Sequence, residues 1–236
     1  MGRSAARLAF AVTSASVLLI TLVTPAHALT IQEYPSPHGD DIALGPDGNM
    51  WSALQDVFAV ARITDTGAIT DLPVTQRDTE YLVGTTSGPD GKIWFTEDYG
   101  GGSGEYARIG RMTTSGTVTE FTLPTITSGA GRIAPGPDGA LWFAGDPSAI
   151  GRITTSGKIT EFPIPGGDTA DITAGPDGNM WFTEWNGNKI GRLTHAGVFT
   201  EYPVPTASSV PDRITAAGDR GMWFTEHAHK IGRVQP

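Results

Sequence analysis

The stretch "ITAGPDGNMWFTEWNGNKIGR", from Ile172 to Arg192, contains the phrase that decides the fold. Its centre, "GPDGNMW", occurs a second time, letter for letter, at Gly45–Trp51. Related phrases occur three more times, at Gly88–Glu97, Gly136–Gly145 and Ala217–Glu226. One phrase written five times indicates a chain built from five similar structural units.

The aligned tryptophans give the period of the repeat. They lie 43, 48, 39 and 42 residues apart, at Trp51, Trp94, Trp142, Trp181 and Trp223. A period near forty residues predicts a propeller or another repeat array. Each unit holds four short strand-like runs, and glycine in the turns supplies the positive φ that tight hairpins need. The sequence therefore predicts an all-β, five-bladed β-propeller of four-stranded antiparallel blades.

The five aligned tryptophans are also predicted core residues. Each follows an apolar residue and most precede Phe, a run typical of a strand buried on both faces. Trp185 is out of register with them, so we expect it to be exposed and available for binding.

The first residues have the pattern of an export signal. Arg3 and Arg7 precede the apolar run Leu8–Val23, and "AHA" at Ala26–Ala28 is an A-x-A cleavage site. We expect a signal peptide at residues 1–28, cleaved after Ala28, and one secreted propeller domain at residues 29–236. An uncleaved membrane anchor is the alternative.

The two ends of the mature chain are complementary. It opens with "LTIQEYP", which matches the fourth-strand phrase "FTEYPVP" at Phe199–Pro205, and it closes with "KIGRVQP", a third strand with no fourth. The N-terminal strand is therefore predicted to join the last blade and close the ring, with Glu33 opposite Arg233. A fragment of a longer array is the alternative.

Composition limits the possible partners. The mature chain has 208 residues, with 14 basic and 25 acidic side chains, a net charge of −11. This charge disfavours nucleic acid and anionic membranes. The absence of cysteine excludes Cys-based metal sites and nucleophiles. We expect a monomer that binds a small molecule or another extracellular ligand.

Some conspicuous charges are predicted to be structural. A two-residue turn at Ser156–Gly157 would place Arg152 opposite Glu161 on the neighbouring strand. The same counting pairs Arg111 with Glu120, Arg192 with Glu201 and Arg62 with Asp71. We interpret these as cross-strand ion pairs rather than as an anion site.

Strand direction predicts where a binding site lies. In an up-and-down blade, the short "PDG" and "TSG" turns share one end of the ring. The loops after each second strand and the connections between blades share the other end, here named the mouth. The insertion Asp98–Tyr106 and the connection Thr206–Arg213 belong to it. The predicted ligand-binding residues at the mouth are Trp185, Glu184, Glu97, Arg213 and Tyr99.

The phrase "WFTEHAHK", at Trp223–Lys230, is the densest group of ionisable residues. Glu226, His227 and nearby Asp212 are the candidate catalytic residues, because a carboxylate beside an imidazole could transfer protons or hold a divalent metal. His38 is expected to face the same rim. Solvated loop residues without chemistry are the alternative, and no metal ligands are assigned.

The phrases "ITAGPDGNMWFTEWNGNKIGRLT" and "ITEFPIP" closely resemble the virginiamycin B lyase family, also called streptogramin lyases, and the resemblance covers residues 29–236. It implies a propeller that opens cyclic depsipeptide antibiotics of the streptogramin B type by elimination across the ester. It also implies a divalent metal such as Mg²⁺, histidines in "P-H-x-I" phrases of late blades, and a glutamate in the last blade.

The chain departs from this family pattern in several places. The resemblance implies seven blades, where this sequence has five. Asp212 stands where the last blade should carry histidine, Ala170 stands at the matching place one blade earlier, and Asp40 does so in the first blade. His227 occupies the glutamate position, with Glu226 adjacent. The histidine base is missing from its usual position.

The function favoured by these observations is a non-catalytic or divergent extracellular binding protein that uses the mouth of the central channel. The first alternative is a lyase that opens streptogramin B-type lactones by metal-assisted elimination. The second is another metal-assisted lactone-cleaving enzyme. Metal content and antibiotic inactivation would separate the three.

Overall fold

The computed structural model describes residues 33–34, 39–55, 57–74, 80–99, 107–127, 129–146, 148–165 and 168–236, with backbone alone at positions 40, 80 and 99. Residues Pro35–Pro236 form one compact unit. In the other unit, Met1–Tyr34, only Glu33 and Tyr34 are described, and neither belongs to a strand. The predicted signal peptide, His38 and Tyr106 lie outside the described residues.

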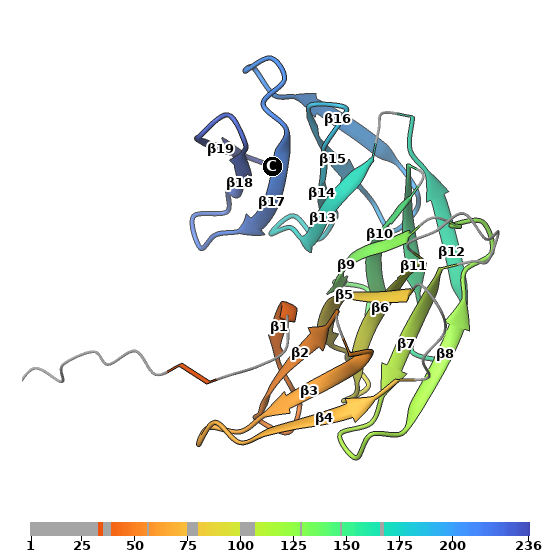
Figure 1. Ribbon diagram of the computed structural model, residues 1–236. Coiled ribbons are helices and arrows are strands. Elements are labelled where there is room, and N and C mark those ends of the chain that lie inside the picture. Colours follow the sequence, from red (N-terminus) through yellow and green to blue (C-terminus); the bar gives the residue numbers. More distant parts are fainter. Residues whose placement is uncertain are drawn as a thin grey trace, which may run out of the picture. The chain divides into compact units, whose positions relative to one another are not determined.

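Within the described residues, nineteen strands form five antiparallel sheets (Figure 1). Sheet A contains β1 (Gly39–Leu44), β2 (Met50–Leu54), β3 (Ala59–Ile63) and β4 (Ile69–Pro73). Sheet B contains β5 (Glu80–Ser87), β6 (Ile93–Tyr99), β7 (Arg108–Met112) and β8 (Val118–Thr122). Sheet C contains β9 (Gly129–Pro135), β10 (Leu141–Asp146), β11 (Ala149–Ile153) and β12 (Ile159–Pro163). Sheet D contains β13 (Thr169–Ala174), β14 (Met180–Glu184), β15 (Lys189–Leu193) and β16 (Phe199–Pro203). Sheet E contains β17 (Pro211–Ala216), β18 (Met222–Glu226) and β19 (Lys230–Val234).

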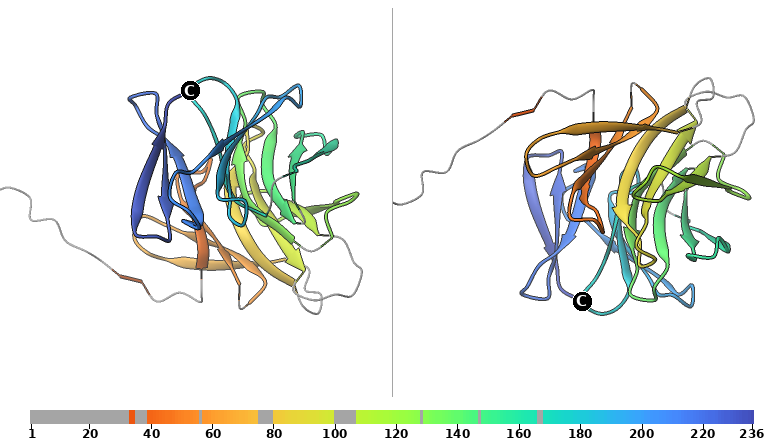
Figure 2. Two further views of the ribbon diagram at one scale, coloured as in Figure 1. Left: turned by 90° about the horizontal axis from the view of Figure 1, so that it is seen from above. Right: turned by 90° about the horizontal axis from the view of Figure 1, so that it is seen from below.

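The first strands of successive sheets contact one another: β1 with β5, β5 with β9, β9 with β13, and β13 with β17. In Figures 1 and 2 these strands lie on the inner side of the array and the fourth strands on its outer side. Within each sheet the strands follow the chain in order, up and down. The predicted all-β class, the up-and-down order and the common end for the short turns are confirmed. No helix able to cross a membrane occurs in the described part of the chain.

The "PDG" turn explains why the phrase is repeated. In sheet D, the carboxylate of Asp177 accepts hydrogen bonds from Trp181 Nε1 (3.0 Å) and Arg192 Nε (2.7 Å). The Arg192 guanidinium also lies over the Trp181 ring, 6.0 Å from its centroid. Burial opposes ionisation of Asp177, but the hydrogen bonds from Trp181, Asn179 and Arg192 lower its pKa to about 2. One aspartate therefore ties the first turn to the second and third strands.

The same aspartate–indole bond recurs in every sheet. The five pairs are Asp47–Trp51 (2.9 Å), Asp90–Trp94 (2.9 Å), Asp138–Trp142 (3.0 Å), Asp177–Trp181 (3.0 Å) and Asp219–Trp223 (3.5 Å).

The second repeated turn differs from the expected two-residue hairpin. In sheet C, Thr154 N donates to Lys158 O (3.0 Å), and Gly157, at φ 90°, lies in the left-handed region. The loop therefore holds three residues, and glycine supplies the conformation that closes it. The extra residue shifts the register of the fourth strand by one position.

That shift makes the predicted cross-strand ion pairs wrong. Arg152 lies opposite Thr160, and Glu161 lies opposite Gly151. The guanidinium of Arg152 instead bonds to Asp138 in the first turn, with Nε 2.7 Å from Oδ2. The same one-residue displacement separates the other three pairs, Arg111–Glu120, Arg192–Glu201 and Arg62–Asp71.

The tryptophans join each sheet to the next. Trp181 packs against Ile214, Met222 and Phe224 of sheet E, and it stacks on Tyr202 of its own fourth strand at 5.4 Å. Four of the five aligned tryptophans are fully buried, as predicted: Trp51, Trp94, Trp142 and Trp181. The prediction for Trp223 is wrong, because this side chain is 38% exposed. No other sheet packs against the outer face of Trp223 in the described residues.

Sheet E also lacks a fourth strand among the described residues, so the prediction of five four-stranded blades is only partly confirmed. Ile231 on β19 is 65% exposed. At the other end of the array, Ile42 and Leu44 on β1 are 59% and 63% exposed. The predicted clasp by residues 29–35, including the pairing of Glu33 with Arg233, stays a prediction.

A glycine substitution tests the packing inside one sheet. A Cβ at Gly191 would lie 2.2 Å from the ring of Phe182, which is fully buried. We expect Gly191→Ala to lower the free energy of unfolding by about 1–3 kcal/mol. Urea denaturation measures this change. The control is Gly218→Ala, whose Cβ would meet no atom within 4 Å, and equal losses at the two sites would contradict the packing described here.

A deletion tests the predicted clasp. Removing Leu29–Pro35 should lower the melting temperature by several degrees, because an exposed sheet edge and apolar face would lose their cover. Calorimetry of the mature and shortened proteins measures the difference. Identical melting temperatures would contradict the clasp.

Candidate ligand-binding site

Each first strand carries a β-bulge near the mouth. Between Thr169 and Ile172 of β13, and between Pro211 and Ile214 of β17, the first strand has one residue more than its partner. The same irregularity occurs in β1, β5 and β9. A bulge redirects side chains out of the regular alternation, which is why bulges accompany binding sites.

Threonines from the "WFT" phrases hold three of these bulges. Thr225 Oγ1 accepts from Arg213 N (3.1 Å), and Thr183 Oγ1 accepts from Asp171 N (3.1 Å). Thr96 Oγ1 does the same for Gly84 N (2.8 Å). The repeat phrase thus fixes the backbone from which the inner side chains project.

Charged residues occupy four of the five equivalent positions on the first strands, each four residues before the turn motif: Asp41, Arg132, Asp171 and Arg213, with Gly84 in sheet B. Arg132 Nη1 lies 2.6 Å from Asp41 Oδ1. The other oxygen of Asp41 accepts from Thr85 N (3.0 Å). These bonds tie sheet A to sheets B and C.

Asp171 makes a similar link between sheets D and E. Its carboxylate accepts from Ile172 N and from Ile214 N, both at 2.9 Å. Burial raises the pKa of Asp171, although these bonds and Arg132 act in the opposite direction. Asp41 and Asp171 therefore both already have donors.

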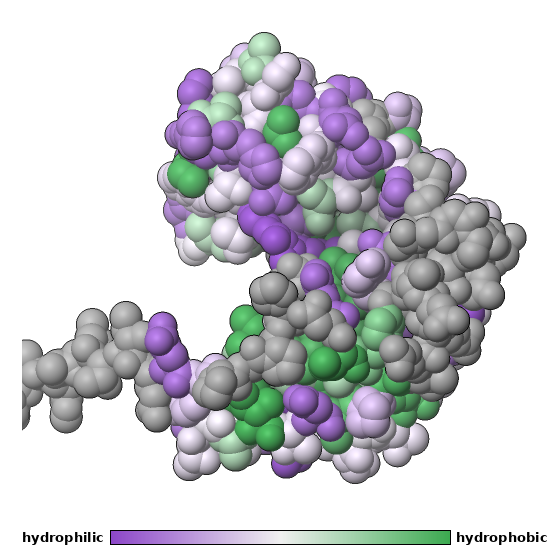
Figure 3. All heavy atoms as spheres, in the orientation of Figure 1, coloured by the Kyte–Doolittle hydropathy of each residue, from purple (hydrophilic) through white to green (hydrophobic). Residues whose placement is uncertain are grey.

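The inner strands of sheets A, C, D and E surround a pocket of about 590 Å³. Figure 3 shows hydrophilic side chains gathered where the surface is hollowed beside β13 and β17. Isoleucines alternate with the charged residues in its lining, but the side chains of Ile172 and Ile214 are buried between the sheets. The pocket therefore offers mainly charged and polar contacts.

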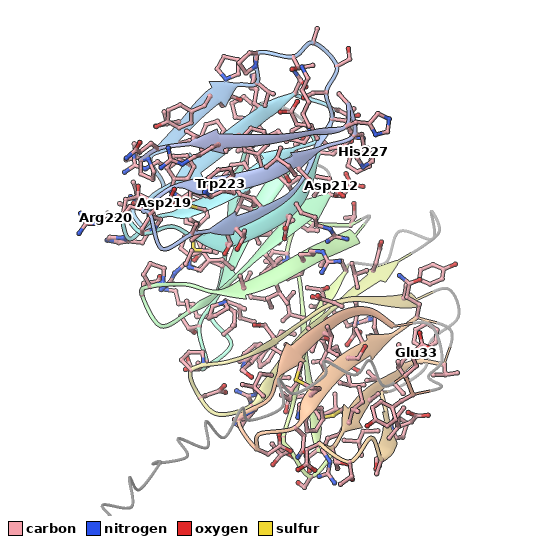
Figure 4. The ribbon with its side chains drawn as sticks, turned by 90° about the vertical axis from the view of Figure 1, so that its left-hand side faces the viewer. Glu33, Asp212, Asp219, Arg220, Trp223 and His227 are labelled. Atoms are coloured by element: carbon pink, nitrogen blue, oxygen red, sulfur yellow. The ribbon has the colours of Figure 1, made fainter. Side chains whose placement is uncertain are left out.

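At the mouth, four of the predicted site residues come together. His227 Nε2 and Arg213 Nε each lie 3.7 Å from Asp212 Oδ2. The His227 ring meets Trp185 edge to face, with centroids 4.5 Å apart. Figure 4 shows Asp212 and His227 at one end of sheet E and Asp219 and Arg220 at the other. Trp185 is half-buried, less exposed than expected.

Asn188 fixes the connection that leads into this cluster. Its Oδ1 accepts from Ser209 N (2.8 Å) and Val210 N (3.3 Å), and its Nδ2 donates to Thr206 O (2.9 Å). Val210 O in turn accepts from His227 N (3.2 Å). Val210 has φ 54°, an unusual conformation for a β-branched residue. Sequence reasoning missed Asn188, because nothing in the repeat phrase distinguishes it.

The three glutamates predicted at the mouth are buried rather than open to it. Glu97, Glu184 and Glu226 lie at or near the ends of their second strands, and Glu226 is opposite Pro211. Glu184 shares a strand face with Phe182, which packs on Trp142 of sheet C. Glu184 therefore faces the neighbouring sheet, and the geometry does not bring the three carboxylates to the mouth together.

Glu184 belongs to a charged group within sheet D. It lies opposite Lys189, whose Nζ is 2.8 Å from Glu201 Oε2. Burial, together with the negative charge of Glu201, raises the pKa of Glu184 to about 7. In sheet B, Glu97 likewise lies opposite Arg108.

The remaining predicted residues are only partly described. The backbone of Tyr99 ends β6, but its side chain, like that of Asp40, lies outside the described atoms. Asp41, Arg132 and Asp171 were missed as site residues. Their signal was present in the sequence, since all three stand at one fixed distance before the turn.

The described side chains do not fit a magnesium site. No group of three or more His, Asp or Glu residues in the described part of the chain could hold a metal. Mg²⁺ prefers several oxygen ligands, whereas Asp212 has the Arg213 guanidinium and an imidazole beside it. A cation at this carboxylate would be repelled by Arg213.

Antiparallel sheets packed face to face, with inner strands around a central pocket, define a β-propeller fold. Comparison with family models is specific: the chain belongs to the virginiamycin B lyase family, whose model matches residues 26–236. No curated protein sequence matches the chain.

Solved structures of similar proteins point to the same family. A catalytically inactive histidine-to-alanine variant of virginiamycin B lyase from Staphylococcus aureus, crystallised with quinupristin, is 42% identical at a TM-score of 0.76. The match covers 82% of this chain and 65% of that chain. Selenomethionine-substituted virginiamycin B lyase from the same organism is 38% identical at 0.77, covering 88% and 74%. A streptogramin B lyase is 34% identical at 0.71, covering 83% and 67%. The chain thus spans about two thirds to three quarters of these lyases.

A Glu184→Gln variant tests the charged group in sheet D. The folded-state pKa of about 7 lies above the ordinary 4.5, so the protonated form favours folding. Its contribution is complete below about pH 4.5 and is lost as pH rises through 7. At about pH 8 the variant should be more stable than the parent by on the order of 1–3 kcal/mol, with little difference at low pH.

Urea denaturation across this pH range measures the effect. The exposed Asp65→Asn serves as the control for loss of one negative charge. Parallel pH profiles for the parent and Glu184→Gln would show that Glu184 ionises normally, against this expectation.

Proposed function

We propose that the chain is an exported, monomeric binding protein that holds a small molecule at the mouth and does not cleave it. The supporting observation is the pair of contacts that the Asp212 carboxylate makes. The family resemblance places histidine there, and Asp212 instead lies 3.7 Å from both Arg213 and His227. A carboxylate held between two such partners is a poor base for removing a proton from a substrate carbon.

The relative from Staphylococcus aureus supports separating binding from catalysis. A single histidine-to-alanine change accompanies a catalytically inactive lyase, yet that variant was crystallised with quinupristin. The present chain departs from the family pattern at its own histidine positions, Asp212 and Ala170. Retained binding with lost chemistry is therefore the expected combination.

The alternative remains a lyase that opens streptogramin B-type rings. The 42% identity to virginiamycin B lyase over 82% of the chain favours it. In that case the proton would have to pass to His227, the imidazole that contacts both Asp212 and Trp185. A gluconolactonase-like activity has less support, because the putative gluconolactonase among the solved structures is 17% identical, a likeness of fold alone.

One experiment separates these functions. The protein is recovered from the medium of expressing cells, where a start at Leu29 by mass spectrometry would support export. It is then incubated with quinupristin and Mg²⁺, binding is measured by calorimetry, and ring opening is followed by mass spectrometry. We expect binding without a linear product.

Matched variants locate the site. Trp185→Ala should weaken quinupristin binding about tenfold or more without changing the melting temperature. Val198→Ala, which shortens an exposed apolar side chain beside the turn at the opposite end of sheet D, is the control. Rapid ring opening abolished by His227→Ala would overturn the proposal in favour of the lyase.

A further inference from the structure

The charged side chains on the inner strands differ in how many hydrogen-bond and ion-pair partners they have. Asp41 bonds to Arg132 at 2.6 Å and to a backbone amide of sheet B. Asp171 accepts two backbone amides, one of them from sheet E. These contacts join neighbouring sheets, so Asp41, Arg132 and Asp171 are explained by the assembly of the array.

Arg213 occupies the equivalent position in sheet E but makes no comparable link to another described residue. It pairs with its sequence neighbour Asp212 at 3.7 Å, well beyond the 2.7–2.9 Å of a charge-assisted hydrogen bond. Its side chain is 47% exposed. Most of its five donors are therefore available to a ligand.

The surroundings of Arg213 restrict what that ligand is. The residue lines the pocket of about 590 Å³, whose isoleucines Ile172 and Ile214 have their side chains buried between the sheets. The two carboxylates of the same pocket already have donors, so they offer little to a cationic ligand. The guanidinium fork matches a carboxylate in two parallel hydrogen bonds.

We propose that Arg213 is the anchor of the pocket and that the natural ligand of this protein carries a carboxylate. The carboxylate pairs with the Arg213 guanidinium. This inference rests on the proposed function, in that the same end of the protein binds a small molecule. It adds the chemical class of that molecule.

Asp212 limits the strength of this site. It lies 3.7 Å from Arg213 and competes with an incoming carboxylate for the same donors. Removing its charge should therefore strengthen anion binding rather than weaken it. A solvated arginine without a binding role would not produce this opposite response.

Phenylacetate and its neutral isostere phenylacetamide are the probes, and ligand-observed NMR with the mature protein measures their affinities. We expect phenylacetate to bind more tightly than phenylacetamide. Arg213→Gln should weaken phenylacetate binding about tenfold or more, and Asp212→Asn should strengthen it. Arg220→Gln, at the opposite end of sheet E (Figure 4), is the control for loss of a positive charge.

The outcomes are distinct. Equal binding of the two probes, or equal losses in Arg213→Gln and Arg220→Gln, would overturn the proposal. So would weaker phenylacetate binding by Asp212→Asn. Arg213-dependent phenylacetate binding without any quinupristin binding would retain the carboxylate site while rejecting the proposed function. Quinupristin binding with no preference for phenylacetate over phenylacetamide would retain the proposed function and reject the carboxylate site.

Discussion

The hydrogen bond from tryptophan to the aspartate of the first turn is the contact on which the rest of the structure depends. In sheet D it sets the turn through Asp177, holds Trp181 against the next sheet, and receives Arg192 from the third strand. Local turn, strand pairing and packing between sheets thus share one carboxylate. Repetition of this contact, rather than a single large core, holds each sheet to its neighbour.

The strands and their order could be predicted because glycine-containing turns and apolar runs are local signals. The charge pairing could not, since it depended on counting through a turn whose length the letters do not reveal. One extra residue before Gly157 moves Glu161 from Arg152 to Gly151. Exposure of Trp223 was missed for another reason: its phrase is the same as in the other units, but burial depends on a neighbouring sheet.

The mouth was predictable in part. Strand direction correctly brought Asp212, Arg213, His227 and Trp185 to one place. It failed to separate Glu184 from them, because strand alternation turns this carboxylate toward sheet C. The bulges escaped prediction as well. A bulge is a mismatch between two strands, and a single strand read by itself does not show it.

The bulges also explain how family membership and activity can separate. The turn aspartate, the tryptophan and the "WFT" threonine hold the backbone, while the side chains at the bulge make few structural contacts of their own in sheet E. Arg213 N bonds to Thr225 whatever its side chain is, and Thr183 Oγ1 donates to the backbone carbonyl of Asp212 (2.8 Å). Residues at these positions can therefore change at little cost in stability. A chain can keep the repeat of the lyases and still carry different side chains at the bulges, here Asp212 and an Arg213 whose guanidinium faces the pocket.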